Sequence, residues 1–214
     1  MQVEKITPKS IKKAVKILKH GGTVVYPTET AYALGCDATS AVAKQKIFKI
    51  KNRPKEKSLP VICSSKTQVQ KFFKLPTLAW KIWKKYWPKP VSIILVLSIN
   101  PVKLLRRSTA FGRFNRVKYQ VSREAPVRIS SNKIARDLAR GLGRPIVSTS
   151  ANISGEPAMY DAKEIASVFS RKKNQPDLIL DSGRLEKKPA STIIKIIGEK
   201  IEVLRQGEAK IITN

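Results

Sequence analysis

Apolar residues recur along the chain at two spacings, and these predict alternating helices and strands. After Thr7, which can cap a helix, and Pro8, which suits a first turn, apolar positions follow three or four residues apart. Short continuous apolar runs bounded by turn residues predict strands instead. We expect helices over 8–20, 40–50, 66–73, 76–86, 132–141 and 161–169, and strands over 23–26, 59–63, 92–97, 125–129, 178–180, 191–197 and 201–204.

This alternation predicts an α/β fold: a single domain over residues 1–214 with a twisted sheet of parallel and antiparallel strands flanked by helices. No linker rich in proline and glycine and no repeat interrupts it. In the helix over 40–50, Val42, Ile47 and Phe48 are expected to face the core. Tryptophans 80, 83 and 87 fall on one helical face, and this pattern favours a core stripe over a platform that stacks on nucleic-acid bases.

Composition narrows the class of protein. The 214 residues are 42% hydrophobic, which permits a sizeable core, and no apolar run is long enough to span a membrane. The N-terminus lacks the apolar segment of a secretory signal. The two cysteines, Cys36 and Cys63, have no CxxC spacing, so we expect neither a disulfide framework nor a zinc site. A reducing cytoplasm is the expected compartment.

The charge is strongly positive. Lys and Arg number 43 against 15 Asp and Glu, a formal net charge of +28, which favours polyanions and nucleic acid above all as partners. Alternatively, the lysines only cover solvated faces. The segment 99–124 combines basic with aromatic residues, as in an RNA-contacting loop or a mobile active-site lid. Its candidate RNA-binding residues are Arg106, Arg107, Arg113, Arg116 and Lys118.

Several catalytic arrangements are absent from the sequence. The only histidine, His20, stands at a helix end, where a capping cation is favoured over a proton shuttle, so no serine–histidine triad is available. Neither a Walker-type phosphate loop nor GxGxxG occurs, and no cluster of carboxylates suggests a bound metal. Chemistry on a nucleotide would therefore depend on positioning and on stabilisation by cations.

Two polar loops follow strand-like runs, where ligands collect in open α/β sheets: residues 148–155, rich in hydroxyls and one amide, and residues 27–30. Lys51 and Arg53 could clamp a polyphosphate, the lysine as a point charge and the arginine as a fork. Each feature also has a structural interpretation. The first loop could be a hydroxyl-capped turn, the second a helix entry, and Arg205 part of a surface turn. The carboxylate of Glu29 could orient water or magnesium, or pair with a cation.

Seven blocks occur in an order that resembles the Sua5/YciO/YrdC family over roughly residues 8–208. They are Tyr26 to Gly35, Lys51 to Pro54, Trp87 to Ser92, Val127-Arg128, Ser148 to Gly155, Ser191-Thr192 and Leu204 to Gly207. The resemblance is greatest to the short, single-domain branch. It implies a large, positively lined central cavity and threonylcarbamoyl-AMP synthase activity, a nucleotidyl transfer in which ATP, L-threonine and bicarbonate give threonylcarbamoyl-AMP and pyrophosphate. The product serves the N6-threonylcarbamoyl modification of adenosine 37 (t6A) in tRNA.

The resemblance also assigns residues and partners. Lys51 and Arg53 would be catalytic. The ATP-binding set would be Lys51, Arg53, Lys57, Ser150, Asn152 and Arg205, and the threonine-binding set would be Thr30, Tyr32, Arg128 and Ser191. Magnesium would arrive with ATP, with no metal held by the protein itself. Expected partners are tRNA or double-stranded RNA on the basic surface and the proteins of the later transfer step.

The sequence departs from the family pattern at five positions: Ala33 in place of Gly, Lys89 and Ser92 in the Gly-Pro-Leu-Thr block, Ile62 where the longer branch has His, and Ser131 in place of Pro. Two alternatives to the enzyme stay open. One is a non-catalytic relative that binds double-stranded RNA, tRNA or ribosomal precursors. The other is a carbamoyl-transfer domain that acts on a different acceptor.

Overall fold

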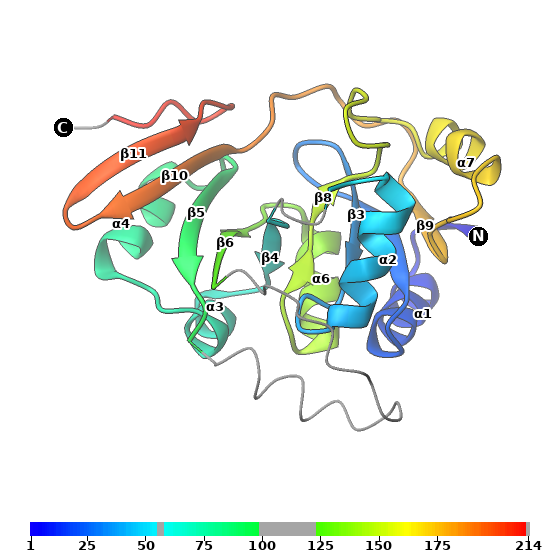
Figure 1. The fold of residues 1–214 in the computed structure, drawn as a ribbon, viewed down its shortest axis with the longest axis horizontal. Coiled ribbons are helices and arrows are strands. Elements are labelled where there is room, and N and C mark those ends of the chain that lie inside the picture. The colour runs from blue at the N-terminus through cyan, green and yellow to red at the C-terminus, as the bar shows by residue number, and fades with distance from the viewer. Residues whose placement is uncertain (55–57, 99–122, 213–214) are drawn as a thin grey trace.

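The strands form two mixed sheets in the computed structural model, which describes residues 1–54, 58–98 and 123–212 (Figure 1). The five-stranded sheet has the order β1 (Gln2–Lys5), β9 (Leu178–Asp181), β2 (Thr23–Pro27), β3 (Tyr32–Cys36) and β8 (Thr149–Ser150). The six-stranded sheet has the order β11 (Lys200–Arg205), β10 (Thr192–Ile197), β5 (Val91–Val96), β6 (Glu124–Ile129), β4 (Val61–Cys63) and β7 (Ile146–Val147). Each sheet contains parallel and antiparallel pairs.

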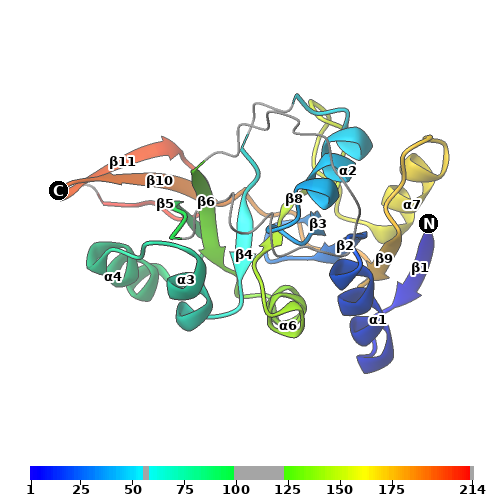
Figure 2. The ribbon, with the colours of Figure 1, turned by 60° about the horizontal axis from the view of Figure 1, so that its bottom comes forward.

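Six described helices flank the sheets: α1 (Pro8–Lys19), α2 (Ala41–Lys51), α3 (Lys66–Phe72), α4 (Thr77–Tyr86), α6 (Lys133–Leu142) and α7 (Ala162–Ser170). Figure 2 shows α4, α3, α6 and α1 on one side of the strands, and α2 and α7 on the other. Helix starts follow the capping residues. Thr7 forms a capping box with Ser10, and the side chains of Asn132 and Asp161 accept from backbone N–H groups of α6 and α7.

Three groups of buried residues fill the space between helices and sheets. Helices α2 and α7 pack on the five-stranded sheet through side chains such as Ile47 and Phe169. Helices α3 and α4 pack on the six-stranded sheet around Trp83. On the side of the strands away from α2 and α7, α1 and α6 bury Leu18 and Leu138 (Figure 2). Burying this much apolar surface is the main force that holds the layers together.

The two sheets are joined directly at Ser148. Strand β7 ends at Val147 in the six-stranded sheet, and β8 begins at Thr149 in the five-stranded sheet. The backbone N–H of Ser148 donates to the carbonyl oxygen of Pro60 at 2.8 Å. One residue therefore carries the chain from one sheet to the other.

The α/β class, the mixture of strand directions and all the expected helices are confirmed, but several details differ. The strands are divided between two sheets instead of one, and β1, β3 and β8 were not foreseen. Val42, expected in the core, is 45% exposed, because α2 turns Ala43 and Ile47 inward instead. Trp87, expected to share the stripe of Trp83, is 46% exposed, because it follows the last helical residue and the helical spacing no longer applies. None of the described helices is long and apolar enough to cross a membrane.

Candidate functional site

A cavity of about 510 Å³ opens between residues of the two sheets. Ala33 and Ser150 line it from the five-stranded sheet, and Arg128 and Ile193 from the six-stranded sheet. A volume of this size is typical of small-molecule sites, and its lining carries several basic and hydroxyl groups. The cavity is thus suited to a polar, negatively charged ligand.

Of the fifteen site residues that the sequence predicts, nine lie within the described ranges, and the structure brings these together. Seven of them line the cavity, namely Thr30, Tyr32, Arg53, Arg128, Ser150, Ser191 and Arg205. Lys51 and Asn152 do not line it, but they contact each other directly behind the Ser150 wall. Six predicted residues lie outside the described ranges: Lys57, Arg106, Arg107, Arg113, Arg116 and Lys118.

The ammonium group of Lys51 is buried and uses its three N–H donors within the protein. It donates to the carbonyl oxygens of Ser150 and Asn152 at 2.6 Å each, and to Oδ1 of Asn152 at 3.1 Å. Its side chain comes from the last turn of α2, and only 1% of the residue is exposed. Burial, with the nearby charge of Arg53, lowers the pKa of Lys51 to about 8. In this structure Lys51 therefore fixes the shape of the 150–152 loop.

The rest of that loop is held by its own polar groups. The hydroxyl of Ser150 donates to Oδ1 of Asn152 at 2.5 Å, and Nδ2 of Asn152 donates to the carbonyl oxygen of Glu156. The backbone N–H of Ser154 donates to the carbonyl oxygen of Lys51 at 2.7 Å. The hydroxyl-rich loop and the end of α2 thus form one hydrogen-bonded unit beside the cavity.

Arg53 takes the opposite direction from Lys51 and faces the cavity. Asn52, in the left-handed conformation (φ 49°), ends α2 between the two cations. One terminal nitrogen of Arg53 donates to the carbonyl oxygen of Ser58 at 3.1 Å, and burial lowers the pKa of its guanidinium. Its Nε is buried and has no hydrogen-bond partner among the described residues. Since buried polar atoms are normally paired, this nitrogen is available to a ligand or a water molecule.

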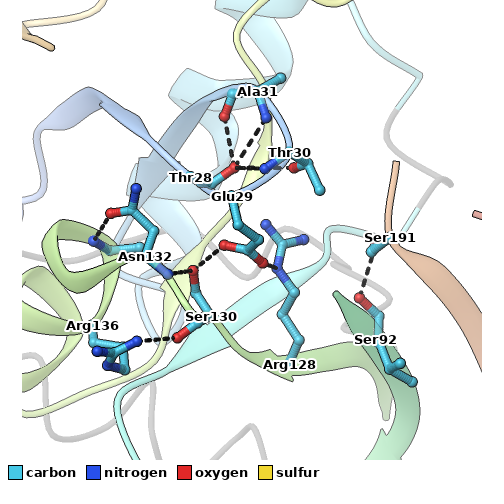
Figure 3. A network of polar contacts seen from close by, with 12 residues as sticks. Thr28, Glu29, Thr30, Ala31, Ser92, Arg128, Ser130, Asn132, Arg136 and Ser191 are labelled. Carbon is cyan, nitrogen blue, oxygen red and sulfur yellow. Dashed lines mark hydrogen bonds and ion pairs between the residues drawn. The ribbon is translucent and has the colours of Figure 1, made fainter. Parts of the chain in front are cut away.

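On the other side of the cavity, Arg128 forms an ion pair with Glu29 (Figure 3). Its Nε lies 3.0 Å from Oε1 of Glu29, but the N–H is not aimed along this line, so the contact is electrostatic and not a hydrogen bond. The hydroxyl of Ser130 donates to Oε2 of the same carboxylate. Of the two roles that the sequence leaves open for Glu29, the structure therefore shows pairing with a cation.

Ser191 is held between Ser92 and Arg205. The hydroxyl of Ser92 donates to Oγ of Ser191 at 3.1 Å (Figure 3). Arg205 donates to the carbonyl oxygen of Ser191 from Nε at 3.1 Å and from a terminal nitrogen at 2.7 Å. Burial and then the charge of Arg128 lower the pKa of Arg205. Two arginines that repel each other across one cavity favour an anion between them.

The 28–31 loop is a hydroxyl-stabilised turn that leads into β3. Oγ1 of Thr28 donates to the carbonyl oxygen of Ala31 at 2.6 Å and accepts from the backbone N–H of Thr30 at 3.2 Å. The helix entry considered for this segment is wrong, because the next element is a strand. The hydroxyl of Tyr32 donates to the carbonyl oxygen of Gly183 at 2.7 Å, and burial raises the pKa of this group to about 12. Tyr32 is fully buried beside the cavity, and its hydroxyl is occupied by the protein.

Sequence patterns did not point to Tyr160 and Lys188, which also line the cavity. The hydroxyl of Tyr160 lies 3.4 Å from the carbonyl oxygen of Lys188. The segment before α7 meets the connection from β9 to β10 here, because the backbone N–H of Leu185 donates to the carbonyl oxygen of Tyr160 at 2.7 Å. That connection runs from the five-stranded to the six-stranded sheet (Figure 1). No group of three or more His, Cys, Asp or Glu that could hold a metal ion occurs in the part of the chain that the structure describes.

Known proteins that are similar in sequence to most of this chain include the following two. A threonylcarbamoyl-AMP synthase of Psychromonas ingrahamii is 34% identical over 172 residues, which cover 79% of this chain and 83% of that protein. An uncharacterised protein of Haemophilus influenzae is 31% identical over 199 residues, 92% of this chain and 88% of that protein.

Two solved structures are similar over nearly the whole chain. P. abyssi Sua5 complexed with L-threonine is 28% identical with a TM-score of 0.78, and the match covers 96% of this chain. The chain spans only 56% of that Sua5 protein. E. coli YciO is 26% identical with a TM-score of 0.77, and 98% of this chain matches 95% of YciO.

The family model Sua5/YciO/YrdC, described as "Telomere recombination", matches residues 16–207. This match extends over most of the chain and includes every described residue that lines the cavity. The chain therefore belongs to the Sua5/YciO/YrdC family.

Proposed function

We propose that this protein is a threonylcarbamoyl-AMP synthase that supplies t6A biosynthesis in the cytoplasm. The observation that carries the proposal is one cavity with Arg53 and Ser150 on one wall, and Arg128, Ser191 and Arg205 on another. Such a cavity suits a ligand with two anionic ends, a phosphate chain and an amino-acid carboxylate. The relative named threonylcarbamoyl-AMP synthase and the Sua5 complex with L-threonine support the same assignment.

The chemistry needs no nucleophile from the protein. The amine of threonine condenses with bicarbonate to a carbamate and water. A carbamate oxygen then attacks the α-phosphorus of ATP, and the bond from that phosphorus to the oxygen bridging to the β-phosphate breaks. Pyrophosphate leaves with the electron pair, and the mixed anhydride with AMP remains. Alignment of the two reactants and exclusion of water are the main requirements on the site.

The side chains divide this work. Arg53 and the Ser150 loop would contact the phosphates, where fixed cations stabilise the charge that develops on the leaving group. Arg128 would bind the threonine carboxylate with its terminal nitrogens, since its Nε already faces Glu29. Thr30 and Ser191 would contact the remaining polar atoms of threonine. Magnesium would enter with ATP, and Lys51 would act by holding the loop in place.

The test is pyrophosphate release from ATP. We expect release that requires both L-threonine and bicarbonate, that is lost in Arg53→Ala, and that is retained in the surface variant Lys49→Ala in the last turn of α2. Release that does not depend on threonine would remove the assignment.

A second candidate is a non-catalytic member of the fold that binds RNA, which the net charge of +28 favours. The same assay separates the two, because this candidate predicts RNA binding without pyrophosphate release under any combination of substrates.

A further inference from the structure

The helices α4, α3, α6 and α1 form a continuous layer on the side of the sheets away from α2 and α7 (Figure 2). Lys66 of α3 lies 4.6 Å from the ring centre of Trp80 in α4. Gln68 of α3 donates from Nε2 to a carbonyl oxygen of α6 at 2.9 Å. Gly141 of α6 packs so closely on Val15 of α1 that a Cβ at this position would lie 2.8 Å from the valine side chain. We call these four helices the basic layer.

The basic layer carries far more positive than negative charge. It has thirteen Lys and Arg residues, five in α1, two in α3, three in α4 and three in α6, against one acid, Asp137. Nine lysines in the layer are exposed, namely Lys9, Lys12, Lys16, Lys19, Lys71, Lys81, Lys84, Lys85 and Lys133. Within the described ranges, only Lys13, Lys133 and Arg140 of the layer pair with an acid. The unpaired charges create a positive field over this face.

This charge does not serve the cavity. No residue of α1, α3, α4 or α6 is among those that line it. The proposed reaction of threonine, bicarbonate and ATP therefore assigns no role to the basic layer.

An exposed aromatic residue, Trp87, directly follows α4 and lies beside Arg136 of α6. Trp87 is 46% exposed, whereas Trp83 of the same segment is 6% exposed. The guanidinium of Arg136 lies 5.7 Å from the ring centre of Trp87, and its NH1 is fixed by a hydrogen bond of 2.7 Å to the carbonyl oxygen of Ser130. An exposed aromatic ring with a held cation beside it is the arrangement on which unpaired bases stack in nucleic-acid complexes.

We propose that the basic layer binds a nucleic acid, with its lysines on the phosphate backbone and Trp87 stacked on an unpaired base. The partner is a folded hairpin-like RNA or DNA that offers both features. A membrane surface is disfavoured, because an interfacial helix needs exposed apolar side chains. The exposed large apolar residues in the described structure, among them Val42, Trp87 and Ile197, lie outside the four helices.

The first test measures how hairpin binding depends on charge and salt. A labelled RNA hairpin is titrated with the full chain over a range of salt, with a DNA hairpin of the same sequence as the second arm. Lys12, Lys16, Lys81 and Lys84, all changed to Gln, are compared with Lys172, Lys173, Lys200 and Lys210 changed to Gln, which are exposed elsewhere. We expect the layer variant to bind about tenfold more weakly or worse at ~0.1 M salt. The slope of log affinity against log salt should fall by roughly three to four.

The variant with four lysines changed outside the basic layer shows whether binding depends on this layer or on the positive charge of the whole protein. If both variants lose affinity equally, the basic layer is not the binding surface. If the layer variant binds both hairpins as the unchanged protein does, or loses binding only to vesicles of anionic lipid, the proposal is also overturned. Comparing RNA with DNA shows which of the two the surface prefers.

The second test uses the fluorescence of Trp87. Trp80 is half-buried and Trp83 buried, so quenching on addition of the hairpin should come chiefly from Trp87. Trp87→Phe should keep the affinity but lose most of the quenching, and Trp87→Ala should weaken hairpin binding by roughly 5- to 150-fold. Unchanged quenching in Trp87→Phe would exclude stacking on this residue.

The inference is independent of the proposed enzyme activity. The layer variants change no residue of the cavity, so their threonine-dependent pyrophosphate release without RNA should equal that of the unchanged protein. Loss of hairpin binding with full release supports the surface, whereas absence of release in every variant would count against the enzyme and leave this surface supported.

Discussion

Lys51 and Asn152, 101 positions apart in the sequence, meet behind the wall of the cavity through two hydrogen bonds. The Lys51 ammonium donates to the carbonyl oxygen of Asn152 at 2.6 Å and to its Oδ1 at 3.1 Å. A third bond goes to the carbonyl oxygen of Ser150. Lys51, one of the two cations of the predicted phosphate clamp, therefore organises the loop that carries Ser150.

This relationship predicts that Lys51→Met destabilises the protein. Three buried oxygens would lose their donor, and we expect the free energy of unfolding to fall by roughly 2–4 kcal/mol. Urea denaturation followed by circular dichroism measures this change. Lys49→Met, at an exposed position of the same helix, is the control and should be nearly neutral. An unfolding midpoint that stays constant while activity disappears would indicate that Lys51 acts on the ligand itself.

The lowered pKa of Lys51 predicts a pH dependence with two opposite effects. Above about pH 8 the folded protein loses this proton, and two N–H groups remain for three oxygens, so we expect pyrophosphate release to decline. Between about pH 8 and the ordinary value of 10.5, the unfolded chain binds more protons than the folded one. This group should therefore raise the free energy of unfolding with pH in that window, by up to roughly 1.4 kcal/mol per pH unit.

Denaturation at a series of pH values tests the second effect. The rise should be present in the unchanged protein and in Lys49→Met, and missing from Lys51→Met. The same slope in all three proteins would show that another group is responsible.

The ion pair between Glu29 and Arg128 predicts an effect on threonine more than on ATP. Glu29→Gln removes the charge that orients Arg128, and we expect threonine to bind more weakly by roughly 1–3 kcal/mol. Calorimetric titration with each substrate measures both affinities. Glu164→Gln, an exposed acid in α7, should leave both unchanged. Equal losses for threonine and ATP in Glu29→Gln would instead indicate a general distortion of the cavity.

For Arg205, the role implied by the family resemblance differs from the contact that the structure shows. The resemblance places it among the ATP contacts, whereas the structure shows its fork on Ser191, a predicted threonine contact. Arg205→Lys breaks the forked contact, and we expect threonine affinity to fall by about 1–3 kcal/mol with ATP affinity nearly unchanged. A selective loss of ATP binding in the same titration would instead show that Arg205 contacts the nucleotide.

The cysteines should be inert in the folded protein. Cys36 and Cys63 are both free and buried, and burial raises the pKa of each thiol well above its ordinary value. The thiolate is the reactive form, so we expect a colorimetric thiol reagent at pH 8 to react with neither cysteine until denaturant is added. Rapid labelling of the native protein would show that one of them is accessible.

The sequence was most informative where local chemistry decides the structure. The side chains of Thr7, Asn132 and Asp161 cap helices because they satisfy backbone N–H groups a few residues ahead, so no distant contact is required. Their helices were located to within about two residues. The two-residue strand β8 forms because β3 pairs with it, and no local pattern marks it.

Orientation within an element was harder to predict. Both Val42 and Lys51 belong to α2, and spacing alone favours burying the valine. The structure buries Lys51 instead, since three oxygens from a loop about a hundred residues away offset the cost of taking its charge out of water. Seven residues that line the cavity were named from the order of the sequence blocks, whereas Tyr160, Lys188 and the partners of Lys51, Glu29 and Arg205 depend on tertiary contacts.

The passage of the chain through Ser148 has a mechanical consequence. Ser148 lines the cavity, and the strands on either side of it belong to different sheets. Pulling the sheets apart at this point would break the pairs of Val61 with Val147 and of Leu34 with Thr149 together. A ligand that binds to this segment therefore holds the two sheets together. When it binds, the backbone amide protons of β7 and of β8 should both exchange more slowly, and by similar factors.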